Sequence, residues 1–159
     1  MILAAAAPGA HAAWTVVTYA DEEAGTETRV ARIENRDGYS LEIYRDANDV
    51  IRTRFNMNPL VRLGEESCPT FQVDGRQAGN RSINDAPCIM QGNWAEYVLG
   101  YITDDKVAST EMHNLMNGNN ITYRFILQES GYDETTFSLA GSKRILQEVL
   151  GKNLVVTTE

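Results

Sequence analysis

The sequence predicts a mainly β fold, an antiparallel β-sandwich or barrel-like domain with one or two short α-helices. In several short runs, apolar and polar residues alternate between turn-forming residues, which is the period of half-buried strands. The run 141–150 instead repeats apolar residues at helical spacing, with Ile145, Leu146 and Val149 on one side. We therefore expect a C-terminal helix to close a domain made mostly of strands.

The first half of the chain predicts an antiparallel meander. Strand-like runs cover 14–19, 28–34, 39–44 and 50–57. The dipeptide 37–38 is Asp-Gly, which tolerates the positive φ angles that tight hairpins require. Strands joined by short turns pair with their neighbours in sequence, so the three runs 28–34, 39–44 and 50–57, joined by two tight turns, should form an antiparallel meander.

The middle segment, 58–94, has no clear period and contains both cysteines, Cys68 and Cys88. A structureless segment of this length is unusual in a compact domain unless something fixes it. A metal or redox role normally needs the C-x-x-C spacing, which the chain lacks. We therefore predict a structural disulfide between Cys68 and Cys88, which would stabilise the fold by about 3 kcal/mol on the chain-entropy estimate.

The second half returns to regular structure. Apolar alternation is strongest over 120–129, while 106–117 shows a partial helical stripe. The expected elements are, in order, a strand over 95–103, a short helix over 106–117, a strand over 120–129, a turn over 131–134, a strand over 135–139, the helix over 141–150 and an edge strand over 154–156.

Residues 1–13 are uncharged and rich in alanine. The sequence Ala10-His11-Ala12 before Ala13 fits the small-x-small pattern of signal cleavage sites. We expect 1–13 to be the remnant of an export signal, the alternative being a flexible tail, and 14–159 to form a single β-rich domain.

The charge balance excludes one class of partner. The chain carries 22 acidic and 14 basic residues, a net charge of −8. A nucleic-acid-binding protein needs a basic surface, so we expect no nucleic acid partner. No window approaches the roughly 20 apolar residues that a membrane span needs, so we expect none.

Candidate catalytic and metal-binding residues are few. His113 is the one histidine outside 1–13, and no nucleophile-elbow pattern accompanies it. Asp46, Asn48 and Val50 begin like a calcium loop, but its glycine and final glutamate are missing, and Asp104-Asp105 is also short of ligands. We therefore expect no catalytic residue, no metal and no cofactor.

Three aromatic residues follow the second cysteine closely, Trp94, Tyr97 and Tyr101. An aromatic cluster beside a disulfide-bonded loop predicts a possible binding face. The alternative is that half of these side chains lie in the core and half on ordinary sheet surface.

Several short motifs follow one another in an order that can be compared with known families. They are Trp14-x-Val16, 39–46, Cys88-Ile-Met-Gln-Gly92, 121–127 and Phe137-Ser-Leu-Ala-Gly141. This order resembles the invasion-associated locus B family of bacterial exported proteins, although Thr18 and Asn93 stand where that family often has cysteines. The resemblance implies an exported, β-rich protein without an established enzymatic activity, with a role at the envelope or in host contact and no catalytic residues to transfer.

Together these observations predict a periplasmic or secreted, non-enzymatic binding domain whose partner is a protein of the envelope or of a host surface. Two alternatives remain open. One is a small hydrolase whose carboxylates are brought together only by the fold. The other is an enzyme inhibitor that presents the Cys68–Cys88 loop.

Overall fold

The computed structural model describes residues 13–64, 67–75 and 88–159 of the chain. Over these residues it has eleven strands and two short helices. In chain order they are β1 (Thr15–Asp21), β2 (Thr26–Glu34), β3 (Ser40–Arg45), β4 (Val50–Asn56), β5 (Thr70–Val73), β6 (Ile89–Gln91), β7 (Trp94–Tyr101), β8 (Lys106–Ala108), α1 (Thr110–Asn117), β9 (Asn120–Leu127), β10 (Gly131–Ser138), α2 (Ser142–Leu150) and β11 (Val155–Thr157). The predicted mainly β fold with a helix near the C-terminus is confirmed.

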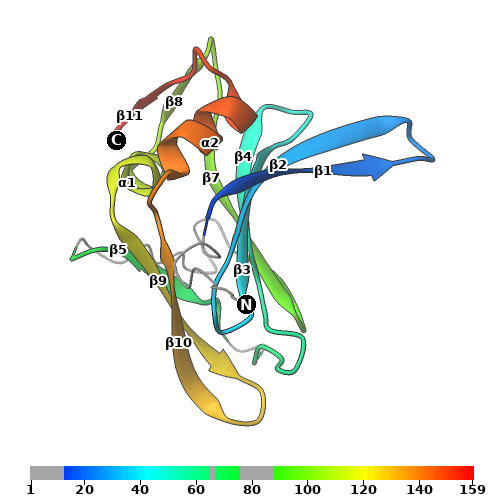
Figure 1. Ribbon diagram of the computed structural model, residues 1–159, viewed down its shortest axis with the longest axis vertical. Helices are drawn as coiled ribbons and strands as arrows, with labels where there is room; N and C mark the ends of the chain where they lie inside the picture. Colours follow the sequence, from blue (N-terminus) through cyan, green and yellow to red (C-terminus); the bar gives the residue numbers. More distant parts are fainter. Residues whose placement is uncertain (1–12, 65–66, 76–87) are drawn as a thin grey trace, which may run out of the picture.

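The described strands form three sheets in a sandwich-like arrangement (Figure 1). The largest has the strand order β1-β2-β3-β4-β7-β6, and the second has the order β10-β9-β5. All neighbours in these two sheets are antiparallel, whereas β11 and β8 form a small parallel pair beside the helices.

The predicted meander of β2, β3 and β4 is confirmed, and β1 adds a further antiparallel strand to it. Side-chain oxygens shape the turns of the meander. Asn35 Oδ1 accepts hydrogen bonds from the backbone amides of Asp37 and Tyr39, and Gly38 takes a φ of 83°. Asp46 shapes the following turn in the same way. Such Asx turns explain why polar residues interrupt the apolar alternation at these points.

The inward side chains of the two larger sheets meet in one buried cluster. At its centre Phe55 of β4 stacks on Tyr123 of β9, with ring centroids 4.4 Å apart. Phe125 and Phe137 pack against Phe55 from the second sheet, and α2 adds Leu146 to the cluster. Large aromatic rings from both sheets thus bury much apolar area.

The disulfide between Cys68 and Cys88 is confirmed, with Cα atoms 6.1 Å apart. Cys68 lies two residues before β5 of the second sheet, and Cys88 directly precedes β6 of the largest sheet. The bond therefore joins the two sheets of the sandwich covalently. The predicted loop between the cysteines falls partly on residues 76–87, outside the described residues.

Two predictions about the irregular parts of the chain were wrong. The segment 58–94 contains β5 and β6, which are so short that they show little periodicity. The expected turn over 131–134 is part of β10, because Tyr132 and Glu134 pair with Ile126 and Arg124 in a hairpin that continues past the core. The chain turns earlier, at 128–130.

The expected helix over 106–117 is correct only in its second part. Residues 106–108 form β8, where buried Val107 pairs with Val156 of β11. The Ser109 hydroxyl then accepts a hydrogen bond from the Met112 amide and caps α1. The partial helical stripe in the sequence thus reflects a strand followed by a capped helix.

The expected export-signal remnant covers residues 1–13, of which 1–12 lie outside the described residues. No helix in the described part of the chain is long and apolar enough to cross a membrane.

Candidate functional site

The outward face of the six-stranded sheet carries an ordered set of charged side chains. Residues opposite one another in register form rows across a sheet, and their side chains point to the same face. One row consists of Arg32, Glu42, Arg54 and Glu96, from β2, β3, β4 and β7, and we call it the charged row. Charge alternates along it, so each carboxylate lies between two guanidinium groups or beside one.

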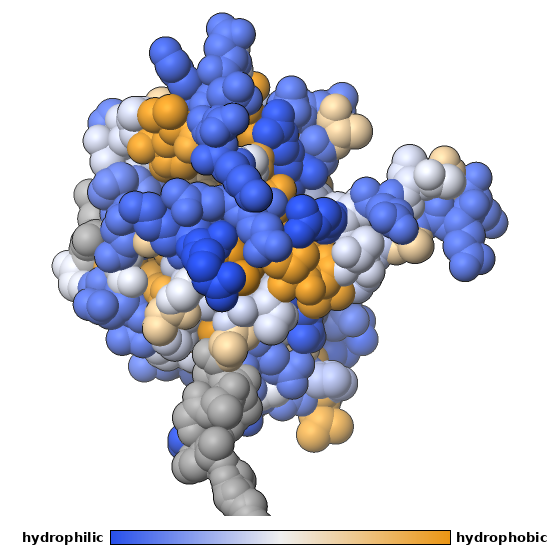
Figure 2. Space-filling model, turned by 45° about the horizontal axis from the view of Figure 1, so that its top comes forward, coloured by the Kyte–Doolittle hydropathy of each residue, from blue (hydrophilic) through white to orange (hydrophobic). Residues whose placement is uncertain are grey.

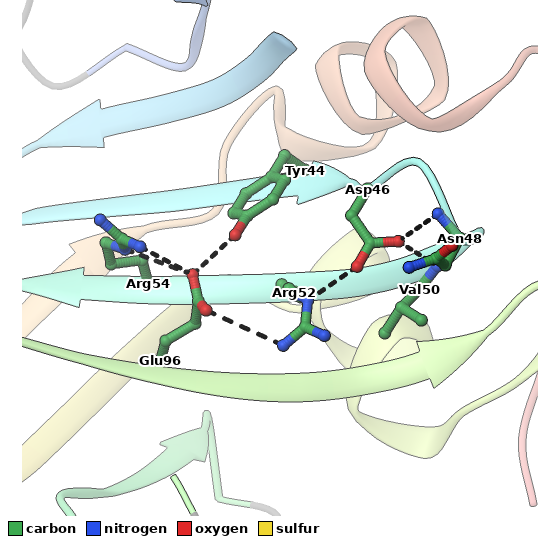
Figure 3. Close-up of polar contacts among 7 residues, drawn as sticks. All are labelled: Tyr44, Asp46, Asn48, Val50, Arg52, Arg54 and Glu96. Atoms are coloured by element: carbon green, nitrogen blue, oxygen red, sulfur yellow. Dashed lines mark hydrogen bonds and ion pairs between the residues drawn. The ribbon is translucent and has the colours of Figure 1, made fainter. Parts of the chain in front are cut away.

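Glu96 is the acceptor at one end of the charged row, and only 7% of it is exposed. Its Oε1 accepts hydrogen bonds from the Tyr44 hydroxyl (2.7 Å) and from Nε and Nη2 of Arg54 (3.3 and 3.2 Å). Its Oε2 lies 3.8 Å from Nη1 of Arg52 (Figure 3). Three side chains from two neighbouring strands thus converge on one carboxylate.

Glu42 has a similar arrangement in the middle of the sheet and is 9% exposed. Asn56 Nδ2 donates to its Oε1 at 3.0 Å, and the Tyr19 hydroxyl donates to its Oε2. Nε of Arg32 lies 3.7 Å from that second oxygen. Both buried carboxylates therefore have partners on each oxygen, as burial of a charge requires.

Asp46 extends the network beyond the charged row. Arg52 Nε donates to its Oδ2 at 2.9 Å, while the amides of Asn48 and Val50 donate to Oδ1 (Figure 3). Burial raises the pKa of Asp46, but the hydrogen bonds from Arg52 and the two amides outweigh it, and the net pKa is lowered. Asp46 thus shapes the turn that the sequence predicted, and it also forms an ion pair with Arg52, which the sequence analysis did not predict.

Tyr44 is the uncharged donor among the three side chains that contact Glu96. Burial, followed by its hydrogen bond to Glu96, raises the pKa of Tyr44 to about 12. Its hydroxyl therefore stays protonated at neutral pH and donates to Glu96.

The residues of the predicted aromatic face, Trp94, Tyr97 and Tyr101, do not share one surface. Trp94 lies on the outward face, where Cζ of Arg54 sits 4.1 Å from the centroid of its ring. Tyr97 points to the opposite face because it lies three residues after Trp94 in β7, and side chains an odd number of residues apart in a strand point to opposite faces. It is 1% exposed and donates its hydroxyl to the Pro69 carbonyl. Tyr101 is 67% exposed at the end of β7.

Sequence reasoning missed the charged row because its members come from four strands. The signal within one strand is weak: Arg52 and Arg54 lie two residues apart in β4, which predicts only that they share a face. Their neighbours Glu42 and Glu96 become visible only when the register of β3, β4 and β7 is known.

The outward face combines nearly balanced charges with fixed side-chain positions. Its network holds three arginines, Arg32, Arg52 and Arg54, and four carboxylates, Glu34, Glu42, Asp46 and Glu96. Since the carboxylates accept hydrogen bonds from arginine, tyrosine, asparagine or the backbone, the arrangement orients donors rather than preparing an acid for proton transfer.

The other residues considered from sequence lie elsewhere. His113 lines a groove of about 280 Å³ between α1, α2 and β11, together with Met116, Lys143 and Leu154. Asp104 and Asp105 form a turn with positive φ angles of 51° and 58°. Within the described residues, no group of three histidine, cysteine, aspartate or glutamate side chains could hold a metal ion.

Comparisons with protein-family models, with curated proteins and with solved structures gave no match for this chain. The resemblance to the invasion-associated locus B family therefore stays a prediction based on short motifs.

Proposed function

We propose that this protein is a non-enzymatic binding domain that acts in the bacterial periplasm or outside the cell and binds a protein partner. The observation that supports it best is the outward face of the six-stranded sheet, where arginine, tyrosine and tryptophan side chains are held in fixed positions. These three residue types dominate the binding energy of protein interfaces.

Pre-organisation strengthens this proposal. Arg54 is held by Glu96 and by the Trp94 ring, and Arg52 by Asp46 and Glu96. About a third of the Arg54 side chain remains exposed, and Tyr19 is 49% exposed, so a partner could contact both. Side chains that are already ordered lose less conformational entropy when a partner binds.

The extracytoplasmic part of the proposal rests on two features. The disulfide between Cys68 and Cys88 fits an oxidising compartment, where such bonds persist. The Ala10-His11-Ala12 pattern fits a signal cleavage site. The resemblance to the invasion-associated locus B family agrees with both and suggests an envelope or host-surface partner.

The test is a binding comparison with variants of the outward face. Immobilised wild-type protein should retain a partner from envelope extract or from host-cell membranes, and Trp94→Ala and Arg32→Ala should each reduce the retained amount about tenfold or more, as expected for hot-spot residues. Tyr132→Ala is the matched control, because it removes a 63% exposed tyrosine from the other sheet.

Retention that is equal for wild type and both face variants would contradict the proposal, provided that circular dichroism shows all variants folded. The hydrolase alternative predicts instead that a substrate is consumed. The inhibitor alternative predicts that changes between the two cysteines, rather than Trp94→Ala, abolish binding.

A further inference from the structure

Strand β1 is an edge of the six-stranded sheet, and its outer side is unpaired among the described residues. β1 pairs with β2 over all seven of its residues, and no other described strand adjoins it. An edge strand presents a row of free N–H and C=O groups that can pair with another chain.

Half of the β1–β2 hairpin extends beyond the rest of the sheet. β3 pairs with β2 only from Val30 to Glu34, so residues 26–29 of β2 and 18–21 of β1 form a two-stranded ribbon. Figure 1 and Figure 2 show this hairpin projecting sideways from the body of the molecule. A two-stranded ribbon is marginally stable in water by itself, and further strands stabilise it.

The edge of β1 lacks the devices that usually prevent pairing. Thr15 to Ala20 contain no charged residue, no proline and no bulge. The other long edge strand, β10, is partly covered, since the carbonyls of Thr136 and Ser138 accept hydrogen bonds from Asn35 and Trp14. The edge strands β5 and β6 have only four and three residues.

We propose that two copies of this chain pair through β1, antiparallel, about a twofold axis at Thr18. This register overlaps all seven residues of both strands. Val17 of one copy then lies opposite Tyr19 of the other, and such pairs of β-branched and aromatic side chains stabilise antiparallel sheets. Val16 lies opposite Ala20 of the other copy in the same way.

The charges of the hairpin favour this antiparallel register. Asp21, Glu22, Glu23 and Glu27 make its tip acidic. In the antiparallel pair the two acidic tips lie at opposite ends, and Asp21 of each copy faces the uncharged Thr15 of the other. A parallel pair would place both tips side by side, and like charges there would oppose it.

Pairing through β1 would place a strand on both sides of β1 in each ribbon, with the local order β2-β1-β1-β2 at the junction of the two sheets. Because opposed residues point to the same face of a sheet, the outward faces of both copies would lie on one side of a continuous sheet. The interface would be isologous, as in most homodimers. This inference does not rest on the proposed function, since it concerns the edge of the sheet and not its face.

Cysteine cross-linking of the full chain tests the register. Directly opposed residues of an antiparallel pair have Cα atoms about 4.5–5.5 Å apart, which a disulfide can span. We expect Thr18→Cys to form a covalent dimer on mild oxidation. Thr26→Cys, the control in β2, should stay monomeric under denaturing, non-reducing electrophoresis. If Thr18→Cys cross-links no faster than Thr26→Cys, the register is overturned.

Sedimentation equilibrium tests the association itself. Wild type should dimerise, and Thr18→Lys should raise the dissociation constant about tenfold or more, because it places two lysines opposite each other at the axis. Thr26→Lys adds the same charge away from the axis and should leave the constant near that of wild type. A wild type that stays monomeric would overturn the proposal, even if it binds an extended strand of a different protein. Equal effects of Thr18→Lys and Thr26→Lys on the dissociation constant would overturn it as well.

Discussion

At the scale of single residues, Glu96 shows how a carboxylate can be buried on the outer side of a sheet. Three donors from β3 and β4 surround it, so its desolvation is compensated by charge-assisted hydrogen bonds. Removing one member of such a group costs more than removing an exposed ion pair, because the remaining charges keep their desolvation cost but lose their partner.

We therefore expect Glu96→Gln to lower the free energy of unfolding by about 1–3 kcal/mol, since Arg52 and Arg54 would then lack a charged acceptor. Glu34→Gln is the control. Glu34 pairs with Arg32 at 3.1 Å, but 56% of its side chain is exposed, and its loss should cost less than about 0.5 kcal/mol. Urea denaturation measures both, and equal effects would contradict the role given to Glu96.

Single residues also explain which parts of the site the sequence could predict. The turn at Asp46 was predictable, because the sequence Asp-Ala-Asn-Asp is a local turn signal. The Asp46 carboxylate accepts hydrogen bonds from the nearby backbone amides of Asn48 and Val50. The side of β7 on which Tyr97 lies was not, since Trp94 and Tyr97 look alike in composition and differ only in strand register. The bond between Tyr19 and Glu42 spans β2 and has no local signal at all.

At the scale of elements, the disulfide has a clear place in the fold. It links the approach to β5 with the approach to β6, and hence the two sheets. Without it, these strands of four and three residues would rely on few backbone hydrogen bonds. The cross-link limits how far the middle of the chain can separate in the unfolded state.

Reduction of the bond, or replacement of Cys68 and Cys88 by serine, should lower the free energy of unfolding by about 3 kcal/mol. Hydrogen exchange should accelerate first within 60–94, because these residues lose their only covalent constraint. Urea denaturation of oxidised and reduced protein, with exchange read by mass spectrometry, checks both statements. Two free thiols in the unreduced protein after unfolding would contradict the premise.

Element types were more predictable than element lengths. The meander and the C-terminal helix follow from strong local periodicity, and the structure contains them with ends shifted by a few residues. β8 was hidden because a three-residue strand has no period to detect, and its partner β11 lies almost 50 residues further along the chain. β10 was shortened because Tyr132, Asp133 and Glu134 are exposed and resemble a turn in composition.

At the scale of the whole molecule, tyrosines on the outward face and in the core make the free energy of unfolding depend on pH in the same direction. Burial raises the pKa of Tyr44 to about 12, and it also raises the pKa of Tyr97 and Tyr123. In the unfolded chain these groups ionise near pH 10, so the folded state binds more protons above that pH. Their contribution to stability is complete below pH 10 and is lost as the pH rises.

We expect the free energy of unfolding to fall from pH 10 to about 12, the range between the unfolded and folded pKa of Tyr44. Tyr44→Phe should be less sensitive to pH over this range, because it removes one of the groups that ionise on unfolding. Urea denaturation at a series of pH values measures the slope. A free energy that stays constant across this range would contradict the burial of these hydroxyls.

The disulfide between the two sheets has a further consequence for the motions of the native state. The bond lies next to β5 and β6, which are edge strands of the two sheets, so it limits how far the sheets can separate at that edge. The helix α2 packs against β1, β2 and β3, towards the end of the largest sheet that lies away from β6, so any opening of the sandwich should be widest near α2.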